Sequence, residues 1–288
     1  MQYVASFDKI YCYPGTNVLK NKFNLRDQAE LLDREKVFVI AKMIGLEMQD
    51  FTNVTFDINH LKNIHKTLFQ DIYSWAGEFR KVNISKEIPF AQVECMNEEL
   101  TRIFTELKGE NYLKGLDLDC LCQRLAYYKA ELNMIHPFRE GNGRTLREFT
   151  RQLVRANYLE FDFQLLDPDK YMFAMKHSAY STTEPLEKLF KDVITRSTVI
   201  SFKKFYGEKY PSLMNLSDSL IMDIQKHGKP LQELNQEYKS LGHSIELGNC
   251  VNQTKFDELD HIFTQIRAVS LSSKKNVPLD HSMDLSLS

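Results

Sequence analysis

The feature that most constrains this chain of 288 residues is the stretch 136–147, which reads HPFREGNGRTLR. It lies between two segments, 118–135 and 144–157, whose apolar side chains have the spacing of buried helices. Pro137 ends the first segment because proline cannot continue a helix. The glycines and the asparagine within 140–143 favour a turn. The sequence therefore predicts two helices joined by a tight, polar turn.

This turn is suited to bind an anion. The first N–H groups of a helix have no intrahelical partners, and the positive end of the helix macrodipole attracts negative charge. Gly141 and Gly143 allow the backbone to approach a ligand closely. Arg144 and Arg147 lie one turn apart, with Arg151 a further turn along, so two or three guanidinium groups can bind phosphate oxygens. The sequence therefore predicts a polyphosphate site.

Two further residue types in the stretch point to group transfer. Glu140 would repel a phosphate unless it holds a hard cation such as Mg²⁺ that bridges phosphate oxygens. His136 has an ordinary pKa near neutrality and can take a proton. A base, a metal ligand and an anion site together indicate attack by a hydroxyl on the phosphorus of a nucleotide.

For each residue taken alone, a structural interpretation stays open. A Gly-Asn-Gly turn between helices is common, His136 can be a helix C-cap, and Arg144 and Arg147 can form a solvated face. A zinc site at His136 and Glu140 is less favoured, because Pro137 spoils the helical spacing of the pair and no further ligands are spaced nearby.

Taken together, the stretch resembles the signature of the Fic family, His-x-Phe-x-(Asp/Glu)-Gly-Asn-Gly-Arg-x-x-Arg. Eight specified positions are filled, by His136, Phe138, Glu140, Gly141, Asn142, Gly143, Arg144 and Arg147. Residues 13–22, YPGTNVLKNK, are similar to the arm that opens many Fic domains, and 71–77, DIYSWAG, to the run that precedes the Fic flap.

Residues 81–92 have the pattern of a short hairpin, with apolar positions around a polar tip and Pro89 at an edge. An edge of this kind can pair with an extended peptide. The resemblance implies that this hairpin is the flap that binds the target, with contacts from Asn83, Ile84, Ser85 and Lys86. A plain surface hairpin is the alternative.

The fold expected from pattern and resemblance is all-α. We expect a Fic domain over 1–197, with an N-terminal arm, the flap at about 81–92 and the motif at 136–147. A helical extension of unknown role follows over 198–272, and 273–288 is expected to be a disordered tail. Further helices are predicted over 26–48, 58–74 with Gly77 just beyond its end, 93–108, 184–195, 212–226 and 255–268, and one beginning at Pro168.

The resemblance implies a protein adenylyltransferase that moves AMP from ATP to a Ser, Thr or Tyr hydroxyl of a target protein. His136 would deprotonate the hydroxyl, and Glu140 would hold Mg²⁺ between the α- and β-phosphates. The amides of 141–143 would stabilise charge on phosphate oxygens, and Arg144 and Arg147 would bind the β- and γ-phosphates. Phe138, apolar in a polar loop, would anchor that loop in the core.

Three alternatives to AMP transfer remain. Some Fic relatives transfer phosphate to a protein, or phosphocholine from a nucleotide-linked donor. A phosphotransferase relative tends to have Ala and Lys at the positions of Gly141 and Gly143, so the glycines here favour AMP transfer. A different class is an interaction protein that uses the motif to sense a nucleotide, although such a module needs neither the base nor the metal ligand.

Composition bounds the partners and the compartment. The net charge of −2 gives no basic surface for nucleic acid or for an anionic membrane. Five scattered cysteines fit a reducing compartment, and no signal peptide or membrane span is recognisable. We therefore expect a cytoplasmic protein, with secretion as an effector left open. The inhibitory pattern of many Fic enzymes, (Ser/Thr)-x-x-x-Glu-(Gly/Asn), is absent, so any inhibition is expected from a separate antitoxin-like protein or a diverged helix.

Overall fold

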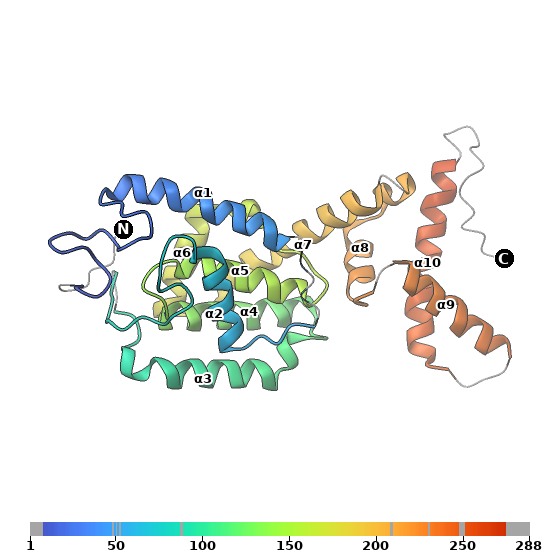
Figure 1. The fold of residues 1–288 in the computed structure, drawn as a ribbon. Coiled ribbons are helices and arrows are strands. Elements are labelled where there is room, and N and C mark those ends of the chain that lie inside the picture. Colours follow the sequence, from blue (N-terminus) through green and yellow to red (C-terminus); the bar gives the residue numbers. More distant parts are fainter. Residues whose placement is uncertain are drawn as a thin grey trace. The chain divides into compact units, whose positions relative to one another are not determined.

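The computed structural model of the chain describes residues 8–47, 49, 51, 53–86, 89–207, 210–229, 231–247 and 251–274. Regular structure in these ranges is helical, with isolated antiparallel bridges at Cys12–Leu19 and Ser85–Pro89 and no strand (Figure 1). The α-helices are α1 (Gln28–Glu47), α2 (Ile58–Phe69), α3 (Val93–Gly109), α4 (Leu118–Ile135), α5 (Asn142–Arg155), α6 (Pro168–Tyr180), α7 (Glu184–Gly207), α8 (Asp218–Gln225), α9 (Leu231–Glu246) and α10 (Gln253–Lys274). Short 3-10 helices are η1 (Asn111–Leu113), η2 (Phe163–Leu165) and η3 (Pro211–Asn215).

Aspartates fix the first residues of three helices. Asp57, Asp117 and Asp167 lie in extended backbone immediately before α2, α4 and α6. Each carboxylate accepts a hydrogen bond from a backbone N–H of the first turn, which otherwise has no partner. These capping bonds set where the three helices begin.

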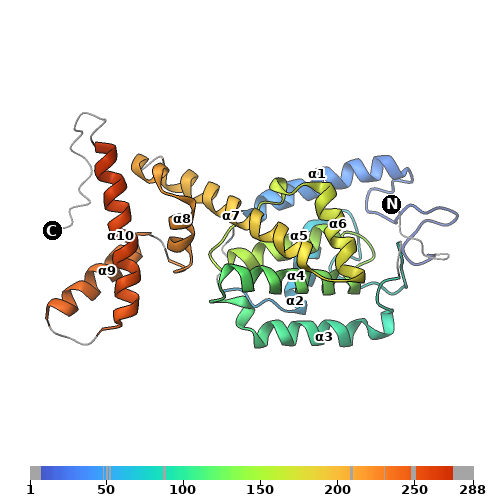
Figure 2. The ribbon, with the colours of Figure 1, turned by 180° about the vertical axis from the view of Figure 1, so that it is seen from behind.

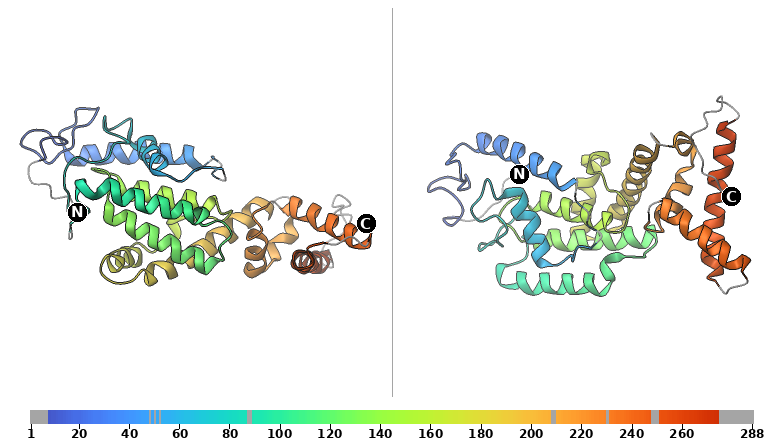
Figure 3. Two further views of the ribbon diagram at one scale, coloured as in Figure 1. Left: turned by 90° about the horizontal axis from the view of Figure 1, so that it is seen from below. Right: turned by 45° about the vertical axis from the view of Figure 1, so that its right-hand side comes forward.

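The chain divides into two compact units, which are described separately. The first comprises Met1–Asn157 with Phe161–Val193, and the second Tyr158–Glu160 with Ile194–Ser288. In the first unit α5 packs between α2 and α4, α1 packs on α2, and α3 and α6 pack on α4. Helix α2 is nearest the viewer in Figure 1 and α6 in Figure 2, while α3 and α4 run side by side in Figures 1 and 3. This order leaves α5 among the innermost helices.

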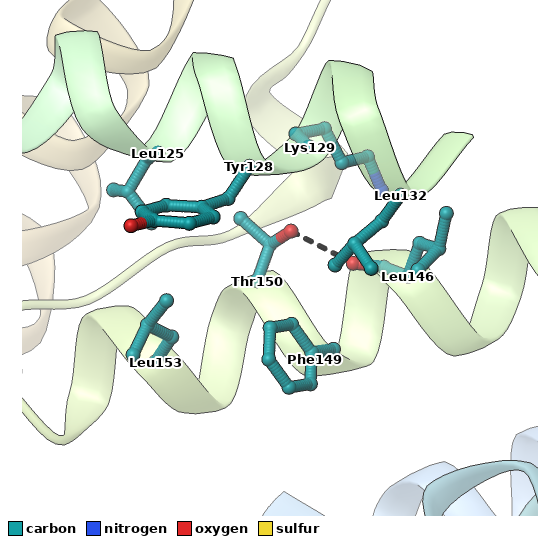
Figure 4. A pocket seen from close by; sticks show the side chains of 8 residues that line it. All are labelled: Leu125, Tyr128, Lys129, Leu132, Leu146, Phe149, Thr150 and Leu153. Carbon is teal, nitrogen blue, oxygen red and sulfur yellow. Dashed lines mark hydrogen bonds between the residues drawn. The ribbon is translucent and has the colours of Figure 1, made fainter. Parts of the chain in front are cut away.

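The sequence of α5 fits this central place. Its buried side chains include the apolar stripe Leu146, Phe149, Leu153 and Val154 and also several polar groups. Thr150 satisfies its hydroxyl locally by donating to the carbonyl of Leu146, at 2.7 Å. Figure 4 shows this bond beside a cavity of ≈ 10 Å³ between α4 and α5. That volume is about one water molecule, so the interface is closely packed and holds no ligand.

Several predicted helices match the structure closely. Helix α4 has the predicted bounds, and α1, α3 and α5 differ from prediction by at most two residues at either end. The prediction for 58–74 was wrong at its end, because α2 stops at Phe69 and turns occupy 70–77. Gly77, with φ +86°, belongs to a later turn, where a Cβ would lie 2.9 Å from Cβ of Lys66. The glycine allows the turn to pack against the side of α2.

The second unit has its own apolar core, which contains the buried residues Val199, Phe202, Tyr206, Leu213, Leu216, Leu220, Ile221, Ile224, Leu234, Leu259, Ile262, Phe263 and Ile266. These come from the end of α7, η3, α8, α9 and α10. Helix α9 was not predicted, and the helix predicted over 184–195 is shorter than α7. Helix α10 runs to Lys274, so residues 273 and 274, predicted to belong to a disordered tail, are helical, and 275–288 lie outside the described residues.

The segment 81–92 contains the isolated bridge between Ser85 and Pro89, and the amide of Phe90 donates to the carbonyl of Ile84 at 3.3 Å. Residues 87 and 88 at its tip lie outside the described ranges. Among the helices of the described chain, none combines the length and the apolar content that crossing a bilayer would need.

Candidate active site

The N-terminus of α5 is built on a glycine that no other residue replaces without strain. Gly141 is the N-cap with φ +82°, and a Cβ there would lie 2.4 Å from the ring of Phe69. The first helical hydrogen bond runs from the amide of Thr145 to the carbonyl of Gly141, at 3.0 Å. The amides of Asn142 and Gly143 precede that bond and have no acceptor within the described chain. They are therefore donors for an anion.

The side chain of Asn142 closes the motif loop. Its Oδ1 accepts from the amide of Phe138 at 2.8 Å, and its Nδ2 donates to the carbonyl of Phe138 at 2.6 Å. The ring of Phe138 is fully buried and stacks on His65 with centroids 3.9 Å apart. Phe138 is thus packed in the interior, while the Asn142 side chain is engaged with the loop and leaves only its backbone for a ligand.

His65 on α2 supports the motif loop, although no pattern in the sequence marks it. Its Nδ1 accepts from the amide of Gly77 at 2.8 Å, so its Nε2 carries the proton and donates to the carbonyl of Glu140 at 3.0 Å. Burial lowers the pKa of His65 to about 3. The ring is therefore neutral near pH 7 and fixes the carbonyl at the start of the turn.

His136, the candidate base, follows α4 as its C-cap in left-handed backbone, with φ 50°. Its Nδ1 lies 2.9 Å from the carbonyl of Asn133, which makes Nδ1 the protonated nitrogen and leaves the lone pair on Nε2. The ring of Phe90 stacks on it at 3.8 Å. The pKa of His136 is lowered to about 3, mainly by burial, with smaller contributions from the positive charges of Lys86 and Arg80. The imidazole is thus neutral, as a base must be.

Arg80 is fully buried and donates hydrogen bonds to several backbone carbonyls around His136. Its guanidinium donates to the carbonyls of His136 at 2.8 Å and Ile135 at 3.1 Å, which are among the last acceptors of α4. It also donates to Val82 at 2.9 Å and to Ala91. One side chain therefore joins the end of α4 to both ends of the segment 81–92.

Glu140 lies beside the helix N-terminus. Its Oε1 accepts from the amide of Gly141 at 2.9 Å and lies 3.7 Å from Nη2 of Arg144. Burial raises the pKa of this carboxyl, and the nearby carboxylate of Glu35 raises it further. A site that disfavours the ionised carboxylate in this way favours a cation beside it.

The three arginines of α5 differ in their surroundings. Arg144 forms an ion pair with the buried Glu35 at 2.5 Å, and its Cζ lies 4.8 Å from the ring centroid of Phe69. Arg147 is partly exposed and has no hydrogen bond or ion pair with any described residue. Arg151 pairs with Glu148 at 2.7 Å and with Glu47 at 3.2 Å. Two carboxylates therefore occupy the guanidinium of Arg151, and of the two or three arginines considered for the phosphate site, Arg144 and Arg147 remain.

The predicted flap residues also differ from one another. Ile84 is buried, and the Oδ1 of Asn83 accepts from the amide of Val93 at 2.9 Å, so both side chains are engaged with the protein. Lys86 is exposed and lies near enough to His136 and Glu140 to lower the pKa of each. Within this group, Lys86 is the side chain best placed to meet a ligand of the site.

The side chains around Glu140 indicate how a metal ion could be bound. No cluster of three or more His, Cys, Asp or Glu side chains that could hold a metal occurs in the part of the chain that the structure describes. Mg²⁺ is commonly held by one or two carboxylates together with substrate phosphates and water. The single carboxylate of Glu140 beside open helix amides fits that mode and does not fit a site made of protein ligands alone.

Comparisons with known proteins identify relatives of this chain. The sequence profile of the Fic/DOC family matches residues 55–154. Protein adenylyltransferase VbhT of Bartonella schoenbuchensis is 37% identical over 193 residues, which cover 66% of this chain and 40% of the VbhT length. Probable protein adenylyltransferase y4lH of Sinorhizobium fredii is 34% identical over 177 residues, covering 61% of this chain and 90% of the relative.

A solved structure has the same fold. The crystal structure of BepC, a VirB-translocated effector of Bartonella tribocorum with bound AMPPNP, superposes with a TM-score of 0.58 at 28% identity. The match covers 64% of this chain and 95% of that one. The similarity is thus to a helical domain that contains a nucleotide in the solved example.

Proposed function

This chain belongs to the Fic/DOC family, of the protein adenylyltransferase type, and from that premise we propose that it transfers AMP from ATP to a Ser, Thr or Tyr hydroxyl of a target protein. The observation that carries the proposal is the juxtaposition of a neutral His136 with the open amides of α5 and an unpaired Arg147. A base beside an anion site is the arrangement that attack on a phosphorus requires.

In the proposed reaction, Nε2 of His136 accepts the proton of the target hydroxyl as its oxygen bonds to the α-phosphorus of ATP. The bond between that phosphorus and the bridging oxygen to the β-phosphate breaks, and pyrophosphate leaves. The amides of Asn142 and Gly143 donate to phosphate oxygens on which negative charge increases, while the amide of the adjacent Gly141 donates to Glu140. Arg144 and Arg147 bind the β- and γ-phosphates, which orients the leaving group.

Glu140 is the proposed ligand of Mg²⁺. When bound, the ion would neutralise charge on the α- and β-phosphates. The raised pKa of the Glu140 carboxyl supports this assignment, because a bound cation would offset the cost of a buried carboxylate. The residues of this chain contribute the carboxylate and the adjacent amides, while ATP itself contributes the remaining charge.

We further propose that 81–92 acts as a hairpin flap for the target. The bridge at Ser85–Pro89 supports the reversal of the chain, and Arg80 holds both ends of the segment. A target strand would pair with the backbone of 83–86, and Lys86 would contact it near His136. The ring of Phe90, which stacks on His136, would have to move for the hydroxyl to reach Nε2.

The proposed domain boundaries rest on the same family membership. We propose a Fic domain over 1–197 and a helical extension over 198–272, whose core is separate from the motif. The cytoplasm is the proposed compartment. Because BepC is named a translocated effector, delivery into another cell is the alternative.

An inhibitor would act on Arg147. A carboxylate supplied to this guanidinium would compete with the γ-phosphate, and no described residue supplies one. We therefore propose a separate antitoxin-like protein, or a diverged helix, as the source of any inhibition.

The test is to incubate the chain with Mg²⁺, a host lysate and ATP labelled in parallel at the α- or γ-phosphate. Protein labelling from the α-phosphate alone is expected, and it should be lost in His136→Ala. His261→Ala, an exposed histidine of α10, is the matched control and should keep activity. Labelling from the γ-phosphate would replace the proposal with phosphoryl transfer. ATP binding without label from either position, in every lysate fraction, would favour a nucleotide sensor.

A further inference from the structure

Glu35 stands where the pattern of α1 calls for an apolar residue. It follows the buried Leu31 by one turn and precedes the buried Val39 by one turn, and it is itself 1% exposed. Burying a carboxylate without partners is costly. Glu35 has two partners, because it accepts from the hydroxyl of Tyr73 and pairs with Nη1 of Arg144 at 2.5 Å. A buried carboxylate on α1 is thus joined to the first arginine of the motif.

The contact leaves most of the Arg144 guanidinium available. An arginine has five N–H donors, and a phosphate needs two of them for a paired contact. Glu35 engages Nη1, and Phe69 supports the planar face. The other terminal nitrogen, Nη2, is 3.7 Å from Glu140, beyond ordinary hydrogen-bond distance. Arg144 is therefore anchored at one edge while its other edge faces the start of α5.

Glu35 also separates two groups with different tasks. Glu140 and Arg144 are four residues apart on one face, the spacing at which opposite charges pair. If Arg144 closed fully on Glu140, the phosphate-binding cation and the proposed metal ligand would neutralise each other. The shorter ion pair to Glu35 holds Arg144 back from that contact.

We propose that Glu35, held by Tyr73, is a positioning residue that presents Arg144 to the β-phosphate of ATP and keeps it from closing on Glu140. This inference rests on the proposed function, since it assigns a part in the same site. Glu35 acts on the nucleotide through Arg144, so it should affect ligands that carry a β-phosphate and spare those that do not.

The experiment is calorimetric titration of the full chain with ATP, ADP and AMP in EDTA, so that no metal contributes. Glu35→Gln should weaken ATP and ADP binding about tenfold, as expected for a disordered charge-assisted contact, and leave AMP binding unchanged. Tyr73→Phe should act in the same direction and more weakly. Glu47→Gln, on the exposed end of the same helix, is the matched control and should bind all three nucleotides like the parent chain.

A double-mutant comparison tests whether the effect of Glu35 on nucleotide binding depends on Arg144. In an Arg144→Met background, Glu35→Gln should have no further effect on ADP binding. The thermal midpoint of each variant identifies any that fail to fold, and Tyr73→Phe then carries the test. If Glu35→Gln weakened AMP binding as much as ATP binding, Glu35 would have only a structural role and the inference would fail. Unchanged or tighter ATP binding in Glu35→Gln would also overturn the inference. A parent chain that binds neither ATP nor ADP, in EDTA or with Mg²⁺ present, would instead overturn the proposed function, and the inference with it.

Discussion

Gly141 and Gly143 are two residues apart but differ in what a side chain would meet. Gly141 has φ +82° and would clash with Phe69, whereas nothing lies within 4 Å of a Cβ built on Gly143. We expect Gly141→Ala to lower the free energy of unfolding by about 1–2 kcal/mol from backbone strain alone, plus the cost of the clash. Gly143→Ala should unfold like the parent chain and bind ATP more weakly, because its methyl group occupies the phosphate side of the turn.

Urea unfolding and ATP titration on both variants check this contrast. A Gly143→Ala variant with full ATP affinity would place the phosphates elsewhere. A Gly141→Ala variant of unchanged stability would mean that the turn relaxes around the added methyl group.

The low pKa of His136, about 3, follows first from burial, and Phe90 supplies one covering ring. We expect Phe90→Ala to admit water and raise this pKa toward the ordinary value near 6.5. Histidine ring signals followed by NMR from pH 4 to 8 measure it, with His136→Asn to assign the signal. If the pKa did not rise in Phe90→Ala, the remaining burial, and not this ring, would account for the low value.

At the level of helices, a few long-range contacts decide how the motif is held. Arg80 joins the end of α4 to the segment 81–92, and His65 joins α2 to the carbonyl before α5. Removing Arg80 leaves buried carbonyls without donors, each costing about 1–3 kcal/mol.

We therefore expect Arg80→Met to lower the thermal midpoint and to expose 81–92 to trypsin, which can cut after Lys81 and Lys86. Lys62→Met, which removes a cation that lies over Phe79 without changing those carbonyls, is the control. Unchanged cleavage in Arg80→Met would show that other contacts suffice to hold the segment.

For the whole molecule, stability should depend on a lysine that the proposed chemistry does not use. Lys129 of α4 is 4% exposed and has no acidic partner among the described residues (Figure 4). Burial, with a contribution from Arg147, lowers its pKa well below the ordinary value. Between the lowered pKa and about 10.4 the unfolded chain binds a proton that the folded chain does not, so this residue makes stability rise with pH.

Lys129→Met should be more stable than the parent chain at pH 7 and should lose part of the rise between pH 7 and 9. Urea midpoints at both pH values measure this, with the exposed Lys108→Met as the control. Equal slopes in Lys129→Met and the parent chain would mean that Lys129 stays protonated in the fold.

The separate core of the second unit leads to a further expectation. A fragment of residues 1–197 keeps Leu186, Phe190 and Val193, which are buried, and should fold and bind ATP like the whole chain. A fragment ending at residue 180 lacks all three and should not fold. Failure of the 1–197 fragment to fold would show that the first unit depends on residues beyond 197.

The sequence alone determined the helix pattern around the motif and the resemblance to a family, because both depend on local spacing. The bounds of α4 and the turn that precedes α5 needed only Pro137, the glycines and the apolar stripe, although 142 and 143, predicted to lie in the turn, are the first residues of α5. Helix α9 was not predicted, and α2 was predicted to be longer than it is. The local sequence preferences in these segments are weak or conflicting, so tertiary packing decides their structure.

Only the tertiary structure decided which charged groups meet. Arg151 lies one helical turn beyond Arg147, where a third phosphate-binding arginine could lie. Its guanidinium nevertheless pairs with Glu47 and Glu148. Glu35 and Arg144 are far apart in the sequence and form one ion pair, and His65 and Arg80 reach backbone carbonyls of the motif that no pattern marks. Periodicity specifies which face of a helix is buried, whereas the partner of a buried charge depends on how separate helices pack.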